Sequence, residues 1–262
     1  MTLIDDFAAE LATATGRLLD TAARLTDADL AAASPLPGWT RGHVVTHLSR
    51  NADSLVRLLT WARTGVRTPQ YPSVAARNAD IEAGAVRQAE RQLPDLRDSA
   101  ARLAGEIAAL PAEAWSRPVA EPSHPAWYVV VRRLREVYVH HVDLDFGYGP
   151  ADWPEVFLTR ELHDIRAVWP VAESTISGVR FLDGAAPAAW TGLGEGPVVQ
   201  GRRHAILAWL IGRSGGEGVT VVAEQGPGET VPAEGPGEPP AAPPWPNTSP
   251  AGLPAVPPRH YP

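Results

Sequence analysis

The sequence contains no cysteine among its 262 residues. This absence excludes disulfide bonds, zinc sites built from thiolates and catalytic cysteine nucleophiles. Lysine is absent as well, since all 23 basic residues are arginine, and this excludes Schiff-base chemistry and lysine bases. If the chain carries out thiol chemistry, the thiol must therefore come from a small molecule.

Long apolar runs and an excess of positive charge are also missing. No stretch approaches the roughly 18 apolar residues that span a bilayer, and the N-terminal segment carries Asp5 and Asp6 where a signal peptide would be basic. The formal charge of −7 offers no electrostatic attraction for nucleic acid or an anionic membrane. We therefore expect a soluble, cytoplasmic protein that acts on small molecules. We also expect a monomer.

The first part of the chain has the apolar spacing of amphipathic helices. We expect four long helices, over residues 3–24, 40–63, 74–110 and 126–146. Thr40 is a candidate N-cap for the second, Pro94 should kink or break the third, and Pro125 suits the first turn of the fourth, with Ser123 or His124 as its cap. Residues 1–150 are thus predicted to form an up-and-down four-helix bundle, and the fold class is mainly α.

After Pro150 the pattern changes to short segments. We expect helices over residues 153–169 and 202–213 and strands over 178–182, 188–191, 197–200 and 218–222. Residues 151–222 are therefore predicted to form a small α+β domain. Residues 223–262 hold 13 of the 27 prolines and few apolar residues, so we expect a flexible tail there.

The residues with the clearest chemistry lie in the predicted second and fourth helices. Glu136 and His140 are one helical turn apart, so a carboxylate oxygen and an imidazole nitrogen can converge on one metal ion. The best candidate for a third ligand is His47, on the second helix. Two histidines and one carboxylate match catalytic zinc sites, which keep a coordination position open, although nickel or iron would also suit these ligands.

Neighbouring polar residues leave alternatives open. His43 lies one turn before His47 and competes with it as a ligand. His141 points about 100° away from His140, which favours a packed or hydrogen-bonded role. Asp143 would either orient a ligand from behind or lie on the surface, and Asn51 either faces the site or makes a local polar contact.

Three motifs resemble the mycothiol-dependent maleylpyruvate isomerases, which belong to the DinB-like metalloenzymes. They are LPGWTRGHVVTHL from Leu36 to Leu48, REVYVHHVDL from Arg135 to Leu144, and WLIGR from Trp209 to Arg213. The resemblance implies a DinB-like four-helix domain joined to a small domain similar to sterol-carrier folds. It also implies that His47, Glu136 and His140 bind zinc and that Arg213 lies at the active site.

By this resemblance the chain is expected to isomerise maleylpyruvate to fumarylpyruvate in gentisate degradation, with mycothiol and Zn²⁺ as cofactors. The thiolate would add to the cis double bond, the resulting single bond would rotate, and elimination would return the trans product. A planar guanidinium such as that of Arg213 suits the substrate carboxylates. Two alternatives stay open: a zinc-dependent mycothiol S-transferase acting on another electrophile, and a non-catalytic binding module on the same fold.

Overall fold

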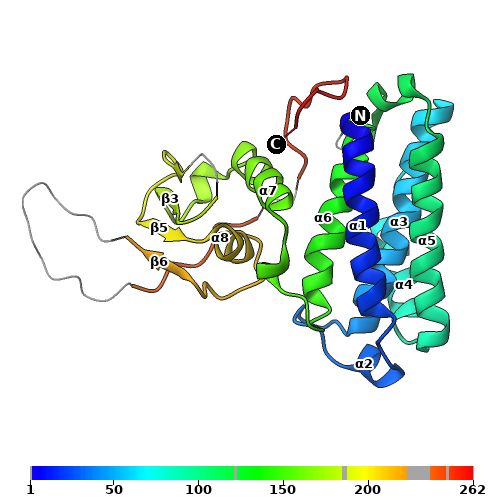
Figure 1. Cartoon of the computed structure of the whole chain (residues 1–262), viewed down its shortest axis with the longest axis horizontal. Coiled ribbons are helices and arrows are strands. Elements are labelled where there is room, and N and C mark those ends of the chain that lie inside the picture. Colours follow the sequence, from blue (N-terminus) through cyan, green and yellow to red (C-terminus); the bar gives the residue numbers. More distant parts are fainter. Residues whose placement is uncertain (1, 121–122, 185–187, 223–236, 246–247, 262) are drawn as a thin grey trace, which may run out of the picture. The chain divides into compact units, whose positions relative to one another are not determined.

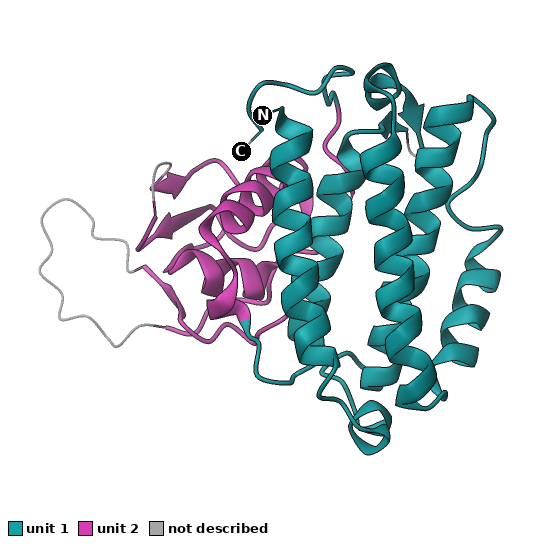
Figure 2. Ribbon diagram, turned by 45° about the vertical axis from the view of Figure 1, so that its right-hand side comes forward, with its two compact units in different colours: residues 1–149, 252–261 teal, residues 150–251, 262 magenta. Residues whose placement is uncertain are grey.

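The computed structural model describes residues 2–120, 123–184, 188–222, 237–245 and 248–261. It divides the chain into two compact units (Figure 2). Unit 1 comprises residues 1–149 and 252–261, and unit 2 comprises residues 150–251. Among the described residues, no helix combines the length and the apolar character needed to cross a bilayer.

Unit 1 is a bundle of four long helices with two shorter ones beside them (Figure 1). The helices are α1 (Leu3–Ala22), α2 (Asp27–Ala31), α3 (Arg41–Thr64), α4 (Val74–Ala85), α5 (Ala89–Ala109) and α6 (Tyr128–Asp143). The long helix α3 packs against α4, α5 and α6, while α1 packs against α5 and α6. The predicted mainly α fold with a four-helix bundle is confirmed.

Helix α3 is the central element of unit 1, and its sequence explains both its start and its position. Thr40 accepts the backbone N–H of His43 through its hydroxyl, and His43 Nδ1 accepts the N–H of Thr40, which together form a capping box. The apolar face of the helix is fully buried: Val44, Val45, Leu48, Ala52, Leu55, Leu58, Leu59 and Ala62. Burial of this face against three other helices holds α3 in the centre of the unit.

Two predicted helix boundaries were wrong. The break in the third predicted helix falls between α4 and α5, over residues 86–88. Pro94 lies inside α5, so the helix does not break there, and a kink at this residue stays a prediction. Pro94 is only the sixth residue of that helix, so its missing N–H removes a single bond close to the helix end. Helix α6 begins at Tyr128 without a side-chain cap, because His124–Pro125 forms strand β2 and pairs with β1 (Pro118–Val119).

Unit 2 contains helices α7 (Glu155–Ala167) and α8 (Arg203–Leu210) and a four-stranded sheet. The strands are β3 (Gly178–Phe181), β4 (Ala189–Trp190), β5 (Val198–Gly201) and β6 (Val219–Val221). Their order is β4-β3-β5-β6, in which only β3 and β5 run parallel. The small α+β character expected for this part of the chain is therefore present.

The described part of the segment after residue 222 makes specific contacts with other parts of the chain. Residues 223–236, which carry much of that prediction, lie outside the described residues. Ala241 accepts a hydrogen bond from the Thr175 hydroxyl in unit 2. Residues 252–261 belong to unit 1, where the indole of Trp127 donates to the Pro254 carbonyl and packs against Tyr261. Aromatic packing of this kind offsets the loss of conformational entropy when residues 252–261 become ordered. The prediction of a flexible tail, made from the proline-rich composition, did not include this packing.

Candidate metal centre

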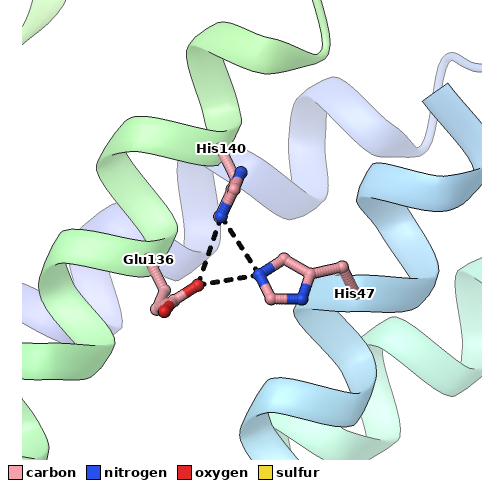
Figure 3. A group of neighbouring side chains, drawn as sticks. All are labelled: His47, Glu136 and His140. Carbon is pink, nitrogen blue, oxygen red and sulfur yellow. Dashed lines mark hydrogen bonds and ion pairs between the residues drawn. The ribbon is translucent and has the colours of Figure 1, made fainter. Parts of the chain in front are cut away.

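Three side chains from two helices meet inside unit 1 (Figure 3). His47 comes from α3, and Glu136 and His140 come from successive turns of α6. His47 Nε2 lies 2.9 Å from Glu136 Oε2 and 3.0 Å from His140 Nε2, and His140 Nε2 lies 3.2 Å from Glu136 Oε2. The structure therefore brings together the three residues that the sequence singled out.

Asp143 positions one of these rings from behind. Its Oδ2 lies 2.7 Å from His140 Nδ1, and its side chain is almost fully buried. The carboxylate accepts a hydrogen bond from the His140 Nδ1–H group, so Nε2 is the ring nitrogen that faces His47 and Glu136. Of the two roles considered for Asp143, the surface position was wrong, and its contact is that of an orienting residue.

The electrostatics of the cluster follow from burial and close pairing. Burial lowers the pKa of His47 to about 4, and the neighbouring His140 adds to that effect. Burial by itself would raise the pKa of Glu136, but hydrogen bonds with His140 and His47 outweigh it and hold that pKa well below its usual value. Burial opposes the charged form of His140, yet hydrogen bonds to Asp143 and Glu136 raise its pKa. Neutral His47 and ionised Glu136 are the forms that bind metals.

The three donor atoms fit a single divalent cation. Ligands about 2.1 Å from one ion lie roughly 3.0 to 3.4 Å apart at octahedral or tetrahedral angles, and the observed separations are 2.9 to 3.2 Å. When both imidazoles are neutral and carry their proton on Nδ1, three lone pairs point toward one position between them, where a cation would be held. Without a cation, the short contacts to Glu136 Oε2 are hydrogen bonds from the imidazole rings.

Arg77 of α4 is a neighbour that the sequence did not reveal. Its Nη2 lies 3.3 Å from His47 Nδ1, on the side of the ring away from Glu136. A guanidinium can only donate, so this contact favours the His47 tautomer with its proton on Nε2. Metal binding at Nε2 requires the other tautomer, and Arg77 must then give up this hydrogen bond. No spacing rule links residues in different helices, so only tertiary structure could identify Arg77.

The other candidate ligands are engaged elsewhere. His43 takes part in the capping box, and its Nε2 lies 3.3 Å from Glu82. His141 lies 2.9 Å from the Thr21 hydroxyl and stacks on Tyr148. The packed and hydrogen-bonded role predicted for His141 is confirmed, and His43 does not join the cluster.

Asn51 and Arg213 occupy separate places. Asn51 Oδ1 accepts a hydrogen bond from Arg133 of α6, so it makes a polar contact between two helices and does not join the cluster. Arg213 belongs to unit 2, where its Nη1 donates to the Ile211 carbonyl and its guanidinium lies over the Trp245 ring. It lines a cavity of about 540 Å³ formed by residues of that unit. Its role at the active site stays a prediction.

Comparisons with known proteins give a consistent result. A family model described as "Mycothiol maleylpyruvate isomerase N-terminal domain" matches residues 11–145, a segment that contains His47, Glu136 and His140. No curated protein matches the sequence. A crystal structure of the mycothiol-dependent maleylpyruvate isomerase is similar at 27% identity and a TM-score of 0.78, over 86% of this chain and 95% of that one.

A crystal structure of a histidine-to-alanine mutant of the mycothiol-dependent maleylpyruvate isomerase is similar at 26% identity and a TM-score of 0.77, with the same coverage. At this level of identity the likeness supports a shared fold and ancestry, while the reaction of this chain has to be argued from its own residues. Because the family model spans more than half of the 262 residues, the chain belongs to the mycothiol maleylpyruvate isomerase family.

Proposed function

We propose that this protein is a metal-dependent, mycothiol-dependent cis-trans isomerase that converts maleylpyruvate to fumarylpyruvate. The observation that carries the proposal is the convergence of His47, Glu136 and His140 within 3.2 Å of one another. The cluster lies in a cysteine-free chain of this family. We propose these three residues as ligands of a divalent metal, with zinc as the first choice.

A bound divalent metal supplies a positive charge that lowers the pKa of a thiol at its open coordination position. The protein's own residues hold that position in place. Glu136 contributes a negative charge, His47 contributes a neutral donor, and Asp143 keeps His140 turned inward. The chain has no thiol of its own, so the sulfur nucleophile must be the small-molecule thiol.

The reaction is balanced without consuming that thiol. Thiolate sulfur forms a bond to one carbon of the cis double bond, and the π electrons move into the conjugated carbonyl as an enolate. The former double bond is then single and rotates. When the enolate re-forms the double bond in the trans geometry, the carbon–sulfur bond breaks and the thiolate is returned. Mycothiol is therefore a cofactor of the proposed reaction. We also propose that the protein acts in the cytoplasm and that it is a monomer.

The test combines metal analysis with a turnover assay. Purified protein should hold about one divalent metal per chain and should isomerise maleylpyruvate only when mycothiol is present, with no loss of free thiol. Glu136→Gln should lower both metal content and rate together. Accumulation of a thiol conjugate would favour the S-transferase, and full metal content with no thiol-dependent rate on maleylpyruvate would count against the isomerase.

Arg213 is proposed as the cation that binds a substrate carboxylate. Replacement by alanine should lower kcat/KM by roughly 10- to 100-fold, the effect of losing a charged hydrogen bond of about 1.5–3 kcal/mol. Metal content should stay unchanged. The matched control is Arg180→Ala, which removes an exposed arginine from β3 of the same unit. Equal effects of the two substitutions would contradict the role of Arg213.

A further inference from the structure

An open apolar groove runs between α1 and α5 of unit 1. Its volume is about 340 Å³. Both helices present small residues to it at one-turn spacing: Ala8, Ala12 and Gly16 on α1, and Ala100, Ala104 and Ala108 on α5. Small side chains at every turn leave space along the length of the two helices.

A buried cation from a third helix lines the same groove. Arg133 of α6 is 1% exposed. Its Nη1 donates to the Leu48 carbonyl at 2.9 Å and to Asn51 Oδ1 at 2.8 Å. Its Nη2 is buried without a hydrogen-bond partner among the described residues. Within that same part of the chain, no carboxylate forms an ion pair with Arg133.

This arrangement is costly unless an anion completes it. A buried charge without a partner destabilises a protein by several kcal/mol. Burial lowers the pKa of Arg133 to about 10, and the charges of Glu136, Tyr71 and Asp53 offset that effect only in part. The guanidinium therefore stays protonated at neutral pH, and its Nη2 amino group keeps both N–H bonds without an acceptor among the described residues.

We propose that this groove binds an unbranched monocarboxylate of about eight carbons, with the carboxylate on Arg133 and the tail along the small residues of α1 and α5. At about 30 Å³ for each heavy atom of a liquid, 340 Å³ holds roughly eleven heavy atoms. None of His47, Glu136 and His140 lines the groove, so the site is distinct from the candidate metal centre and does not depend on the proposed function.

The binding experiment uses the full-length protein and isothermal titration calorimetry at neutral pH. Octanoate should bind with one molecule per chain. Octan-1-ol, which keeps the tail and lacks the charge, should bind at least 10-fold more weakly, and so should acetate, which lacks the tail. His47→Ala should leave octanoate binding unchanged, because the metal centre takes no part.

One single variant and one matched pair of variants locate the ligand. Arg133→Met removes the cation and should weaken octanoate binding at least 10-fold. An ideal Cβ at Gly16 or at Gly105 meets nothing within 4 Å, so the backbone at both positions leaves room for a side chain to begin. Only Gly16 lines the groove. Gly16→Leu should therefore abolish binding, and Gly105→Leu, on the exposed side of α5, should not affect it.

Three results would overturn the proposal. Octanoate that fails to bind the wild-type protein is the first, and equal binding to wild type and Gly16→Leu is the second. The third is a wild-type dimer in sedimentation that becomes a monomer on Gly16→Leu, since a second copy of the chain would then occupy the groove. If Arg133→Met does not fold, the Gly16 and Gly105 pair still decides between these outcomes.

Discussion

At the scale of single residues, the hydrogen-bond partners of a histidine ring decide which of its nitrogens carries the proton. His140 places Nδ1 against Asp143 and turns Nε2 toward His47 and Glu136. His124, which is not part of the cluster, has both ring nitrogens engaged. Its Nδ1 contacts the Pro125 carbonyl at 2.9 Å, and its Nε2 contacts Arg132 at 3.1 Å. A carbonyl accepts and a guanidinium donates, so His124 must be neutral with its proton on Nδ1.

This arrangement predicts a pH-dependent stability. Burial, and next the charge of Arg132, lower the pKa of His124 to about 4, whereas an unfolded histidine has a pKa near 6.5. Between these values the unfolded state binds a proton that the folded state refuses, so stability falls as the pH drops from 6.5 toward 4. We expect His124 to account for a loss of about 2 to 3 kcal/mol by pH 4.5, measured by urea denaturation.

His124→Gln provides the control, because glutamine can both donate and accept but does not titrate in this range. The variant should be less stable than wild type at pH 7.5, and the difference between the two proteins should shrink as the pH falls. Parallel stability profiles for the two proteins from pH 7.5 to 4.5 would refute the role assigned to His124.

At the scale of elements, one glycine sets how closely α3 approaches its neighbours. A Cβ at Gly42 would collide with the Ala85 carbonyl oxygen of α4 and would lie 3.2 Å from the Leu30 carbonyl oxygen of α2. Both atoms belong to the backbone and cannot turn away. Gly42 precedes His47 on α3 by five residues, so displacing the start of this helix would also disturb the candidate metal centre.

Two glycine-to-alanine substitutions should therefore have opposite effects. Gly42→Ala should lower the free energy of unfolding by about 1–3 kcal/mol through overpacking. Gly16→Ala, in open space on α1, should raise it by about 0.5–1 kcal/mol, because alanine is the better helix former. Thermal and urea denaturation of the two variants measure this difference. A stabilised Gly42→Ala would show that α2 and α4 do not hold α3 closely.

At the scale of the whole molecule, the chain passes through unit 2 and then contributes residues 252–261 to unit 1. The fully buried Trp127 donates to the Pro254 carbonyl at 2.9 Å. The Tyr261 ring centroid lies 5.2 Å from that of Trp127 and 6.2 Å from that of Tyr128. This segment therefore covers aromatic residues at the start of α6.

Deletion of residues 252–261 should destabilise unit 1 by about 2–4 kcal/mol, the sum of two aromatic pairs and one hydrogen bond. Urea denaturation followed by tryptophan fluorescence measures this loss. Tyr261→Ala, which removes the ring and leaves Pro254, should have a smaller effect. If the deletion leaves the denaturation midpoint unchanged, the segment contributes nothing to the stability of unit 1.

The sequence alone was sufficient for the four long helices, the Thr40 cap and the i, i+4 pair of Glu136 and His140, because helical periodicity and capping are local rules. It also supplied His47, whose motif stands out without structural help. The sequence did not predict the start of α6 or the position of the break in the third predicted helix. The first depends on strand pairing between β1 and β2, and the second depends on how well Pro94 is tolerated near a helix end, and both are set by the surrounding structure.

Composition and periodicity thus determined the fold class, and the missing residue types excluded any chemistry that needs a protein thiol or a lysine. Local spacing made Asp143 a candidate partner of His140, and the structure selected that role over a surface position. Tertiary structure alone decided that Arg77 faces His47 and that Arg133 lies buried beside an apolar groove. The physical reason is that these two contacts join side chains on different helices through packing, and packing between helices is not encoded in local spacing.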